Sequence, residues 1–239
     1  MIVRVLVTRP EPDAERTAGA LRARGHVVVV APLMRIEAVA DAEIGNGPWA
    51  AILITSANAA RAIAAHRRFA ELRALPVFVV GQHSAEATRA AGFAGAISAD
   101  GDGADLARLV AERLKPGMPL LYLAGADRSG DLAGALGACG FAVRTAVVYR
   151  AVALGVVPRE ATDALAGGID AVLHFSRRSA EAYVNAAHGS GLDERALIKP
   201  AHLCLSAQVA EPLARAGAAD IRIPTKPVEA ALLALIPSA

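Results

Sequence analysis

Short apolar runs alternate with helical patterns along this chain, and a turn of small or polar residues separates each run from the helix after it. The clearest runs cover residues 52–55, 77–80, 120–123, 171–175 and 202–205. Runs this short and this uniformly apolar are typical of parallel strands covered on both faces. Four glycines stand where a helix is expected to end in a left-handed cap: Gly25, Gly92, Gly140 and Gly217. The alternation predicts doubly wound α/β units with right-handed crossovers.

The same pattern occurs twice along the chain. Three pairs of segments match in order, at offsets of 115, 120 and 125: residues 18–35 with 133–150, 54–60 with 174–180, and 79–92 with 204–217. Residues 96–114 and 221–236 share their pattern as well. Four matches in the same order indicate an internal duplication, so we expect two similar α/β units.

Bulk composition is that of a globular protein. Hydrophobic residues make up 54% and charged residues 20% of the 239 residues, and the mean hydropathy is +0.40. No run approaches the roughly eighteen consecutive apolar residues that a membrane span requires. The first residues alternate like a strand and lack the long apolar stretch of a signal peptide. We therefore expect neither a membrane partner nor export.

Charge and cysteine content bear on the binding partners and on the cellular compartment. The net charge is +2, basic residues are spread along the chain and aromatic residues are scarce, so a nucleic-acid surface is not expected. Cys139 and Cys204 show no motif-like spacing, which favours small buried residues in a reducing compartment over a disulfide. These features predict a cytoplasmic location.

Polar residues collect in the strand-to-helix turns, where open α/β sheets bind ligands. The candidates for substrate binding are Arg9, Thr55, Ser56, Asn58, Gly81, Ser84, Arg128, Ser176, Arg177 and Ser179. Any single Ser or Thr among them is more simply explained as a helix cap. Together, several helix N-termini that converge on one cleft would favour an anion, and the neighbouring arginines make a polycarboxylate the natural ligand.

The sequence lacks the familiar catalytic motifs. There is no phosphate-binding loop, no complete dinucleotide fingerprint and no nucleophile elbow. The six histidines show no metal-ligand spacing. We therefore expect neither a metal nor a cofactor.

Tyr149 ends a strand of the second copy at the position where the first copy has Met34. A tyrosine at a strand end commonly packs its ring and exposes its hydroxyl to water. Alternatively, its phenol points into the cleft as a weak acid or hydrogen-bond donor. Both interpretations fit the sequence.

The whole chain resembles the uroporphyrinogen-III synthase family. The resemblance is carried by residues 5–11 (VLVTRPE), 54–59 (ITSANA), 80–85 (VGQHSA) and 148–150 (VYR). Two segments depart from the family's pattern. His174-Phe175-Ser176 stands where a Thr-Ser pair is more usual, and residues 206–209 replace a glycine followed by hydroxyl residues.

This resemblance implies two flavodoxin-like doubly wound domains joined by a two-stranded linker, with a crossed chain path. Residues 1–36 would combine with 154–239 in domain 1, and residues 39–151 would form the inserted domain 2. The linker strands would lie around 33–38 and 148–153. The repeats alone do not reveal this crossing.

The resemblance also implies an activity. Members of the family are lyases of haem biosynthesis that close hydroxymethylbilane, a linear polycarboxylate tetrapyrrole, into uroporphyrinogen III. The reaction inverts ring D through a spiro intermediate, loses water and needs no cofactor. Tyr149 is then the candidate catalytic residue, which would hydrogen-bond the departing hydroxyl. The resemblance favours a monomer and allows the preceding pathway enzyme as a partner.

Two other functions compete with this one. A non-catalytic, two-lobed cytoplasmic sensor of a small polyanion would usually carry an output domain, and the repeats leave no room for one. A nucleotide-sugar transferase would need a nucleotide loop or a metal-binding Asp-x-Asp, and the sequence contains neither.

Overall fold

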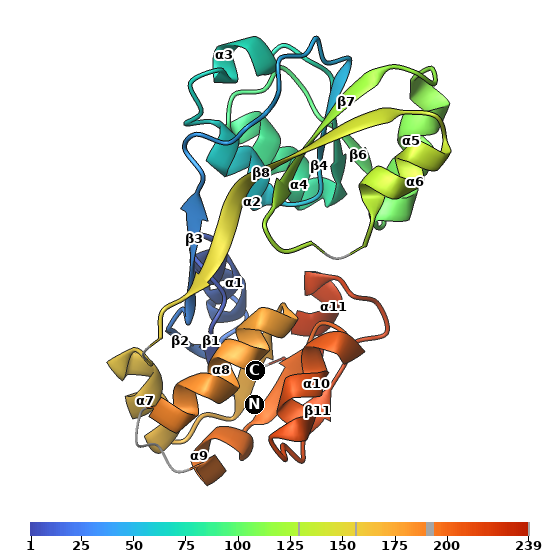
Figure 1. Cartoon of the computed structure of the whole chain (residues 1–239). Coiled ribbons are helices and arrows are strands. Elements are labelled where there is room, and N and C mark those ends of the chain that lie inside the picture. The colour runs from blue at the N-terminus through green and yellow to red at the C-terminus, as the bar shows by residue number, and fades with distance from the viewer. Residues whose placement is uncertain (129, 156, 190–193, 239) are drawn as a thin grey trace. The chain divides into compact units, whose positions relative to one another are not determined.

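The chain folds into two compact α/β units. The computed structural model describes residues 1–128, 130–155, 157–189 and 194–238. The discontinuous unit consists of Met1–Arg35 and Val152–Ala239, and the inserted unit is Ile36–Ala151. Figure 1 shows that each unit is a sheet with helices packed on it.

The discontinuous unit is built on five parallel strands in the order β11-β10-β9-β1-β2. They cover Arg4–Val7 (β1), Val27–Val30 (β2), Ala171–His174 (β9), Ala201–Cys204 (β10) and Ile221–Arg222 (β11). Counted along this unit, the order is the flavodoxin-like 2-1-3-4-5. Sheets of this kind bind ligands at the carboxyl ends of the strands that flank the switch point, which here are β1 and β9.

Helices cover both faces of this sheet. On one face lie α1 (Asp13–Arg22) and α11 (Glu229–Leu233), and on the other lie α7 (Arg159–Ala166), α8 (Arg177–Gly189), α9 (Glu194–Ile198) and α10 (Ala207–Arg215). Because side chains alternate along a strand, Val5 and Val7 pack in the layer of α1, whereas Leu6 packs in the layer of α10. Burial on both faces explains why these strands are mainly apolar.

The inserted unit has six strands in the order β3-β8-β7-β4-β5-β6. They cover Met34–Ala38 (β3), Ala51–Ile54 (β4), Val77–Val80 (β5), Ile97–Ala99 (β6), Pro119–Gly125 (β7) and Ala142–Ala153 (β8). From β8 to β6, every neighbouring pair is parallel. β3 and β8 run through the boundary between the two units and are hydrogen-bonded neighbours.

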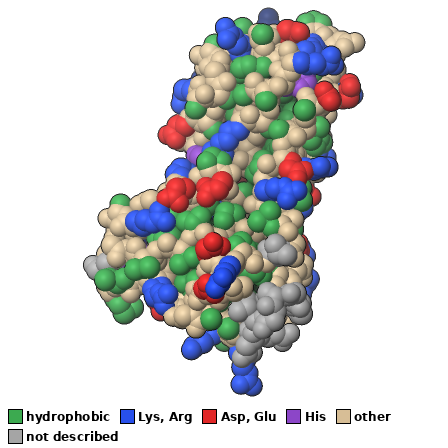
Figure 2. Space-filling model, turned by 90° about the vertical axis from the view of Figure 1, so that its left-hand side faces the viewer, with side chains coloured by type: hydrophobic (Ala, Val, Ile, Leu, Met, Phe, Trp, Pro, Cys, Tyr) green, Lys and Arg blue, Asp and Glu red, His purple; other side chains and the backbone are tan. Residues whose placement is uncertain are grey.

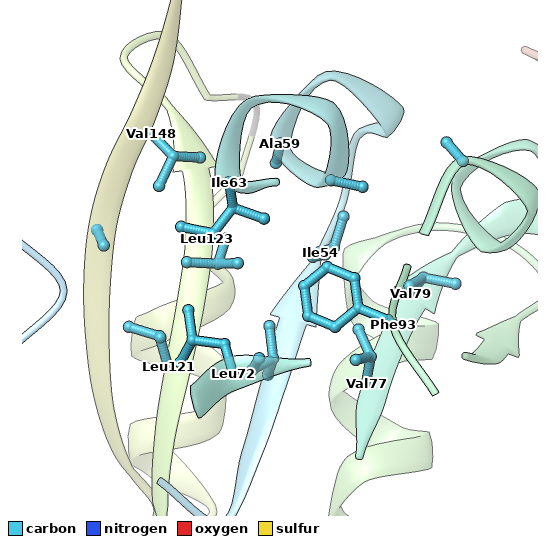
Figure 3. Close-up of a cluster of buried hydrophobic side chains, with 14 of the residues drawn as sticks. Ile54, Ala59, Ile63, Leu72, Val77, Val79, Phe93, Leu121, Leu123 and Val148 are labelled. Atoms are coloured by element: carbon cyan, nitrogen blue, oxygen red, sulfur yellow. The ribbon is translucent and has the colours of Figure 1, made fainter. Parts of the chain in front are cut away.

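Two apolar layers stabilise the inserted sheet. The first packs α2 (Ala57–Ile63), α3 (Phe69–Leu72) and α4 (Gly81–Ala90) on one face, and Figure 3 shows its side chains around Ile54, Leu123 and Val148. The second packs α5 (Gly103–Arg113) and α6 (Leu132–Ala138) on the other face, against Leu53 and Tyr122. The alternation along β4 therefore sends Ile54 and Leu53 to opposite layers.

The two sheets bear out the duplication. The order β8-β7-β4-β5-β6 corresponds, strand by strand, to β2-β1-β9-β10-β11. The register agrees as well, since Ala51 pairs with Leu120 and its counterpart Ala171 pairs with Val5. Ala51 and Ala171 are 120 residues apart in the sequence, and Val5 and Leu120 are 115 residues apart, as the repeat offsets require. β1 and β2 open the first copy but lie in one sheet with β9, β10 and β11 of the second copy. β7 and β8 open the second copy but lie in one sheet with β4, β5 and β6 of the first copy. The two copies have therefore exchanged their opening strands.

The four predicted glycine caps are confirmed. Gly25, Gly92, Gly140 and Gly217 have φ values of 86°, 97°, 85° and 86°. In each case the N–H after the glycine donates to the carbonyl five residues back. The bonds are His26 to Leu21 (3.2 Å), Phe93 to Thr88 (3.3 Å), Phe141 to Leu136 (3.1 Å) and Ala218 to Leu213 (3.1 Å). This is the Schellman pattern, repeated at equivalent places in the two copies.

The predicted fold class, α/β with two parallel-dominated sheets, is confirmed. The predicted strands agree with the observed ones to within one or two residues at most ends. In the described part of the chain, no helix is long and apolar enough to cross a membrane.

Candidate functional site

Tyr149 and Ser56 meet at the switch point of the inserted sheet. This point lies between β4 and β7, and the chain leaves β4 there through Thr55 and Ser56. Tyr149 comes from the next strand, β8, and its phenol faces the Ser56 side chain. The half-buried ring packs against the apolar layer of α2 and α4. Both sequence interpretations of Tyr149 therefore hold in part: the ring packs, and the hydroxyl has a polar partner.

The surroundings of Tyr149 keep its proton bound. Burial raises the pKa of Tyr149 above its ordinary value, because the phenolate would be poorly solvated. The Ser56 side chain opposes this rise, whereas Tyr122 and Asp127 add to it. Tyr149 is thus a neutral hydrogen-bond donor near pH 7.

A second pair of hydroxyls lies on the opposite face of the same strand end. The Thr55 Oγ1 and Tyr122 Oη atoms are 2.9 Å apart. Leu53 pairs with Tyr122 across β4 and β7, and Thr55 follows Leu53 by two residues on the same face. The pair ties the end of β4 to β7 and so fixes the position from which Ser56 projects.

Ser56 also caps α2. Its Oγ accepts a hydrogen bond from the N–H of Asn58 at 3.3 Å. The Asn58 Oδ1 in turn accepts from Arg61 at 3.0 Å. The expectation of a capping serine is confirmed here, and the same side chain reaches the phenol of Tyr149.

The N-terminus of α4 has no side-chain cap. A Cβ atom on Gly81 would meet nothing within 4 Å, and Gly81 has a φ of 74°. Ser84 is 6% exposed. The N-cap residue Val80 provides no side-chain acceptor, which suits a helix start that receives an anion.

Arg128 follows β7 in a loop and does not begin a helix. The next helix, α6, begins at Leu132 and is capped by Asp131. The Asp131 Oδ1 accepts from Gly134 N–H at 2.9 Å. The Arg128 Nη1 donates to the Gly125 carbonyl at 3.5 Å.

In the discontinuous unit, the predicted serines cap α8. The Ser176 Oγ accepts from the N–H of Ser179 at 3.1 Å and lies 2.8 Å from the Ser179 Oγ. Ser179 is 2% exposed, and its hydroxyl points to the Met34 sulfur, 3.8 Å away. Ser176 is thus the more accessible of the two hydroxyls.

Arg9 and Arg177 both pair with carboxylates of the chain. Arg9, whose side chain is 14% exposed, lies 3.3 Å from Asp13 and 3.3 Å from Glu229. Burial lowers its pKa, and the two carboxylates oppose that shift. Arg177 is exposed and pairs with Glu181 at 2.9 Å and Glu211 at 3.1 Å. Figure 2 likewise shows basic and acidic side chains interspersed over the face it presents.

Phe175 has a specific role in this unit. The guanidinium carbon of Arg9 lies 4.0 Å from the centroid of the Phe175 ring, which is cation–π geometry. Phe175 is one of the two places where the sequence departs from the family's pattern. Phe175 thus packs against Arg9, which also pairs with Asp13 and Glu229. The sequence did not reveal this cluster, because Glu229 lies far from Arg9 in the chain.

Two buried histidines pair inside the discontinuous unit. His174 Nε2 and His202 Nδ1 are 3.1 Å apart, and both residues are 0% exposed. Burial lowers the pKa of His174 well below its ordinary value and that of His202 to about 4. Across the described ranges, no group of three or more His, Cys, Asp or Glu residues is arranged to hold a metal ion.

The structure sorts the predicted residues into two groups. Thr55, Ser56 and Tyr149 gather at one switch point, with Tyr122 beside them. Arg9, Ser176, Arg177 and Ser179 belong to the other unit. A single cleft shared by both groups stays a prediction. Sequence reasoning missed Tyr122, although its pairing across from Leu53 follows from the repeat register.

Fold and site together define a duplicated, flavodoxin-like α/β protein with a phenol and a serine hydroxyl at a strand switch point. The sequence model of the family described as uroporphyrinogen-III synthase HemD matches residues 15–234. The chain belongs to the uroporphyrinogen-III synthase family, whose members are enzymes of porphyrin biosynthesis. The family resemblance seen in the sequence is thereby confirmed.

A solved structure agrees with the fold. The crystal structure of uroporphyrinogen-III synthetase from Helicobacter pylori 26695 is 18% identical, covers 98% of each chain and has a TM-score of 0.66. Uroporphyrinogen III synthase from the extremely thermophilic bacterium Thermus thermophilus is 18% identical, covers 98% of this chain and 96% of its own, and has a TM-score of 0.43. At these identities the likeness concerns the fold alone. No curated protein matches the sequence.

Proposed function

We propose that this chain converts hydroxymethylbilane into uroporphyrinogen III with Tyr149 at the reacting end of the substrate. The observation that carries the proposal is the contact between Tyr149 and Ser56 at the switch point of the inserted sheet. Ligands of open α/β sheets bind at such points. Family membership supplies the substrate class.

The proposed reaction begins with loss of the terminal hydroxyl. The C–O bond of the hydroxymethyl group breaks, the oxygen takes up a proton and leaves as water, and the pyrrole nitrogen's electron pair forms an azafulvene. The substituted carbon of the last pyrrole attacks this electrophile and forms a spiro intermediate. The original bond between the spiro carbon and the bridge carbon from ring C then breaks. The freed bridge carbon bonds to the unsubstituted α-carbon of ring D, which inverts that ring, and this α-carbon loses its proton.

Tyr149 would assist the first step by donating a hydrogen bond to the departing hydroxyl. Its raised pKa keeps the phenol protonated, and Ser56, which the cap of α2 and the Thr55–Tyr122 pair hold in place, orients it. Assistance of this kind is typically worth about 10²–10⁴-fold in rate. The remaining contribution would come from holding the substrate in the geometry that favours spiro closure over direct closure.

The substrate's carboxylates would bind at the turns. The ten-residue helix α4 offers N–H groups without a side-chain cap, beside Gly81 and Ser84. Within the described part of the chain, Arg128 forms no ion pair with a carboxylate, so its charge is available to the substrate. Arg9 and Arg177, in contrast, would have to exchange Glu229 or Glu211 for a substrate carboxylate. Arg128 is therefore the leading arginine of the proposed set, with Thr55, Asn58, Ser176 and Ser179 as further contacts.

Several broader features belong to the same proposal. The enzyme would be a lyase that acts as a monomer in the cytoplasm, which agrees with free thiols at Cys139 and Cys204. The preceding pathway enzyme would be its macromolecular partner. Residues 33–38 and 148–153 would act as a two-stranded linker between domain 1 (1–36 with 154–239) and domain 2 (39–151), and would let the domains close on the substrate.

The test is a product analysis. The protein is incubated with freshly made hydroxymethylbilane, and the oxidised porphyrin isomers are separated. A large excess of the type III isomer over a protein-free control supports the proposal. Type I product alone, as in the uncatalysed reaction, refutes it. Type I product together with tight binding of the bilane would favour the non-catalytic sensor.

A further inference from the structure

Tyr149 lies directly on the backbone of Gly125. Gly125 is the last residue of β7, and it pairs with Tyr149 across a register shift that separates it from Ala124. The N–H of the next residue, Ala126, donates to the Tyr149 carbonyl at 2.9 Å. The end of β7 therefore holds both the main chain and the ring of Tyr149.

The space above Gly125 is filled by the phenol. A Cβ atom on residue 125 would lie 2.7 Å from the Tyr149 Cζ, 2.8 Å from its Oη and 3.1 Å from its Cε1. Atoms that are not bonded to each other do not approach so closely, so any side chain at this position would displace the ring. Glycine is the one residue that leaves the ring where it is.

Backbone conformation does not explain this glycine. Among the described residues, twelve glycines have positive φ values, and Gly125 is not one of them. An L-residue can therefore adopt its backbone conformation without strain. The requirement for glycine comes from the contact with Tyr149.

We infer that Gly125 is a positioning residue, whose bare Cα aims the Tyr149 hydroxyl at Ser56 and at the substrate's departing hydroxyl. This inference rests on the proposed function for its catalytic consequence. The positioning itself is a property of the protein that can be measured without substrate. Ser56 supplies the fixed end of the contact, since it is anchored as the cap of α2.

The variant Gly125→Ala tests this inference, with Gly137→Ala as the matched control. Gly137 lies in α6 of the same unit, and a Cβ there would meet nothing within 4 Å. The first readout is an ultraviolet titration of phenolate, in which the curve of Tyr149→Phe is subtracted to isolate Tyr149. Gly125→Ala should move the pKa of Tyr149 back toward its ordinary value, because the displaced ring loses its burial. Gly137→Ala should leave the titration unchanged.

The second readout is kinetic. Gly125→Ala should lower kcat about as far as Tyr149→Phe does, with a smaller change in KM, because the substrate's carboxylates bind elsewhere. In a Tyr149→Ala background there is no ring to displace, so adding Gly125→Ala should lower kcat no further. Gly137→Ala should retain the wild-type kcat. An additive loss in the double variant would overturn the inference.

The titration and the product analysis separate the two claims. If the wild-type protein yields type I product alone, the proposed function fails, and the titration still decides whether Gly125 positions Tyr149. If Gly125→Ala leaves both the titration and kcat at wild-type values, the positioning inference fails and the proposed function stands. Should Gly125→Ala not fold, the Gly125→Ala/Tyr149→Ala double variant decides. Recovery of folding supports the contact, and continued failure to fold overturns it.

Discussion

Met34 and Tyr149 stand 115 residues apart at matching positions of the two copies, and their side chains have different partners. Met34 is 3% exposed, and its sulfur lies 3.8 Å from the Ser179 hydroxyl. Tyr149 is half buried, and its phenol faces the Ser56 side chain. The duplication thus produced one apolar position and one position with a phenol. Chemistry that needs a proton donor is expected at the second.

Tyr149→Phe should lower kcat by about tenfold to a hundredfold, at or below the low end of what general acid assistance contributes, because water can partly replace the phenol. The ring packing is retained, so the unfolding free energy should change by less than about 1 kcal/mol. Steady-state kinetics and urea denaturation measure the two effects. A full rate combined with full type III yield would exclude Tyr149 from the chemistry.

Ser56→Ala should have two separate consequences. Loss of the helix cap should cost about 1 kcal/mol of stability, and loss of the Ser56 hydroxyl should raise the pKa of Tyr149 further, since that hydroxyl lowers it. Asp102→Ala is the control, because Asp102 caps α5 through the N–H groups of Ala104 and Asp105. The control should lose similar stability and keep its activity. Equal activity in both variants would argue against a role for Ser56 in the site.

Stability should fall as the solution is acidified below neutrality. His202 has a pKa of about 4 in the folded protein, against about 6.5 for an unfolded histidine. The unfolded state therefore binds protons first. The contribution of His202 is fully present above pH 6.5 and is lost as pH falls toward 4, up to about 3 kcal/mol.

This loss is measured by urea unfolding at a series of pH values from about 7.5 to about 4.5, a range that covers most of the interval between the two pKa values. His174, whose pKa is also lowered by burial, should act in the same direction. The variant His202→Gln removes one titrating group and should flatten the profile. A profile unchanged by this substitution would mean that other groups cause the acid sensitivity.

Arginines at the turns should separate into structural and substrate-binding residues. Arg9→Ala removes one of the two arginines that pair with Asp13 and Glu229, and Arg16 remains as the other, so it should cost about 1 kcal/mol of stability, less than for a fully buried pair. Arg128→Ala should leave stability unchanged and raise KM severalfold, because a surface charge that contacts a carboxylate is worth about 1 kcal/mol. Thermal melts and KM values of the two variants test this assignment. A raised KM in Arg9→Ala at wild-type stability would reverse it.

Much of the fold follows from the sequence because its signals are local. Apolar runs marked β4, β5, β7, β9 and β10, and the glycines at positions 25, 92, 140 and 217 marked helix ends through their backbone conformation. The exchange of opening segments between copies has no local signal. It depends on whether β1 pairs with β9 or with the corresponding strand β4, and Ala171 and Ala51 lie in chemically similar apolar strands.

The site was harder to predict for the same reason. Ser56 could be named from its place directly after β4. The prediction that Tyr149 ends a strand is wrong, because β8 continues to Ala153 and pairs with β3 as well as β7. Gly125 matters because it contacts the Tyr149 ring where the register between β7 and β8 shifts, and no spacing in the sequence reveals this shift. Arg9 looked available to an anion because its carboxylate partner Glu229 is more than two hundred residues away along the chain.

The most direct test compares the porphyrin isomers made from fresh hydroxymethylbilane by the wild-type protein, by Tyr149→Phe and by buffer alone. If Tyr149 assists the proposed reaction, the wild type should give predominantly type III product, Tyr149→Phe should react more slowly and let more type I product accumulate, and buffer should give type I. Wild-type protein that yields the same isomers as buffer would contradict the proposed reaction.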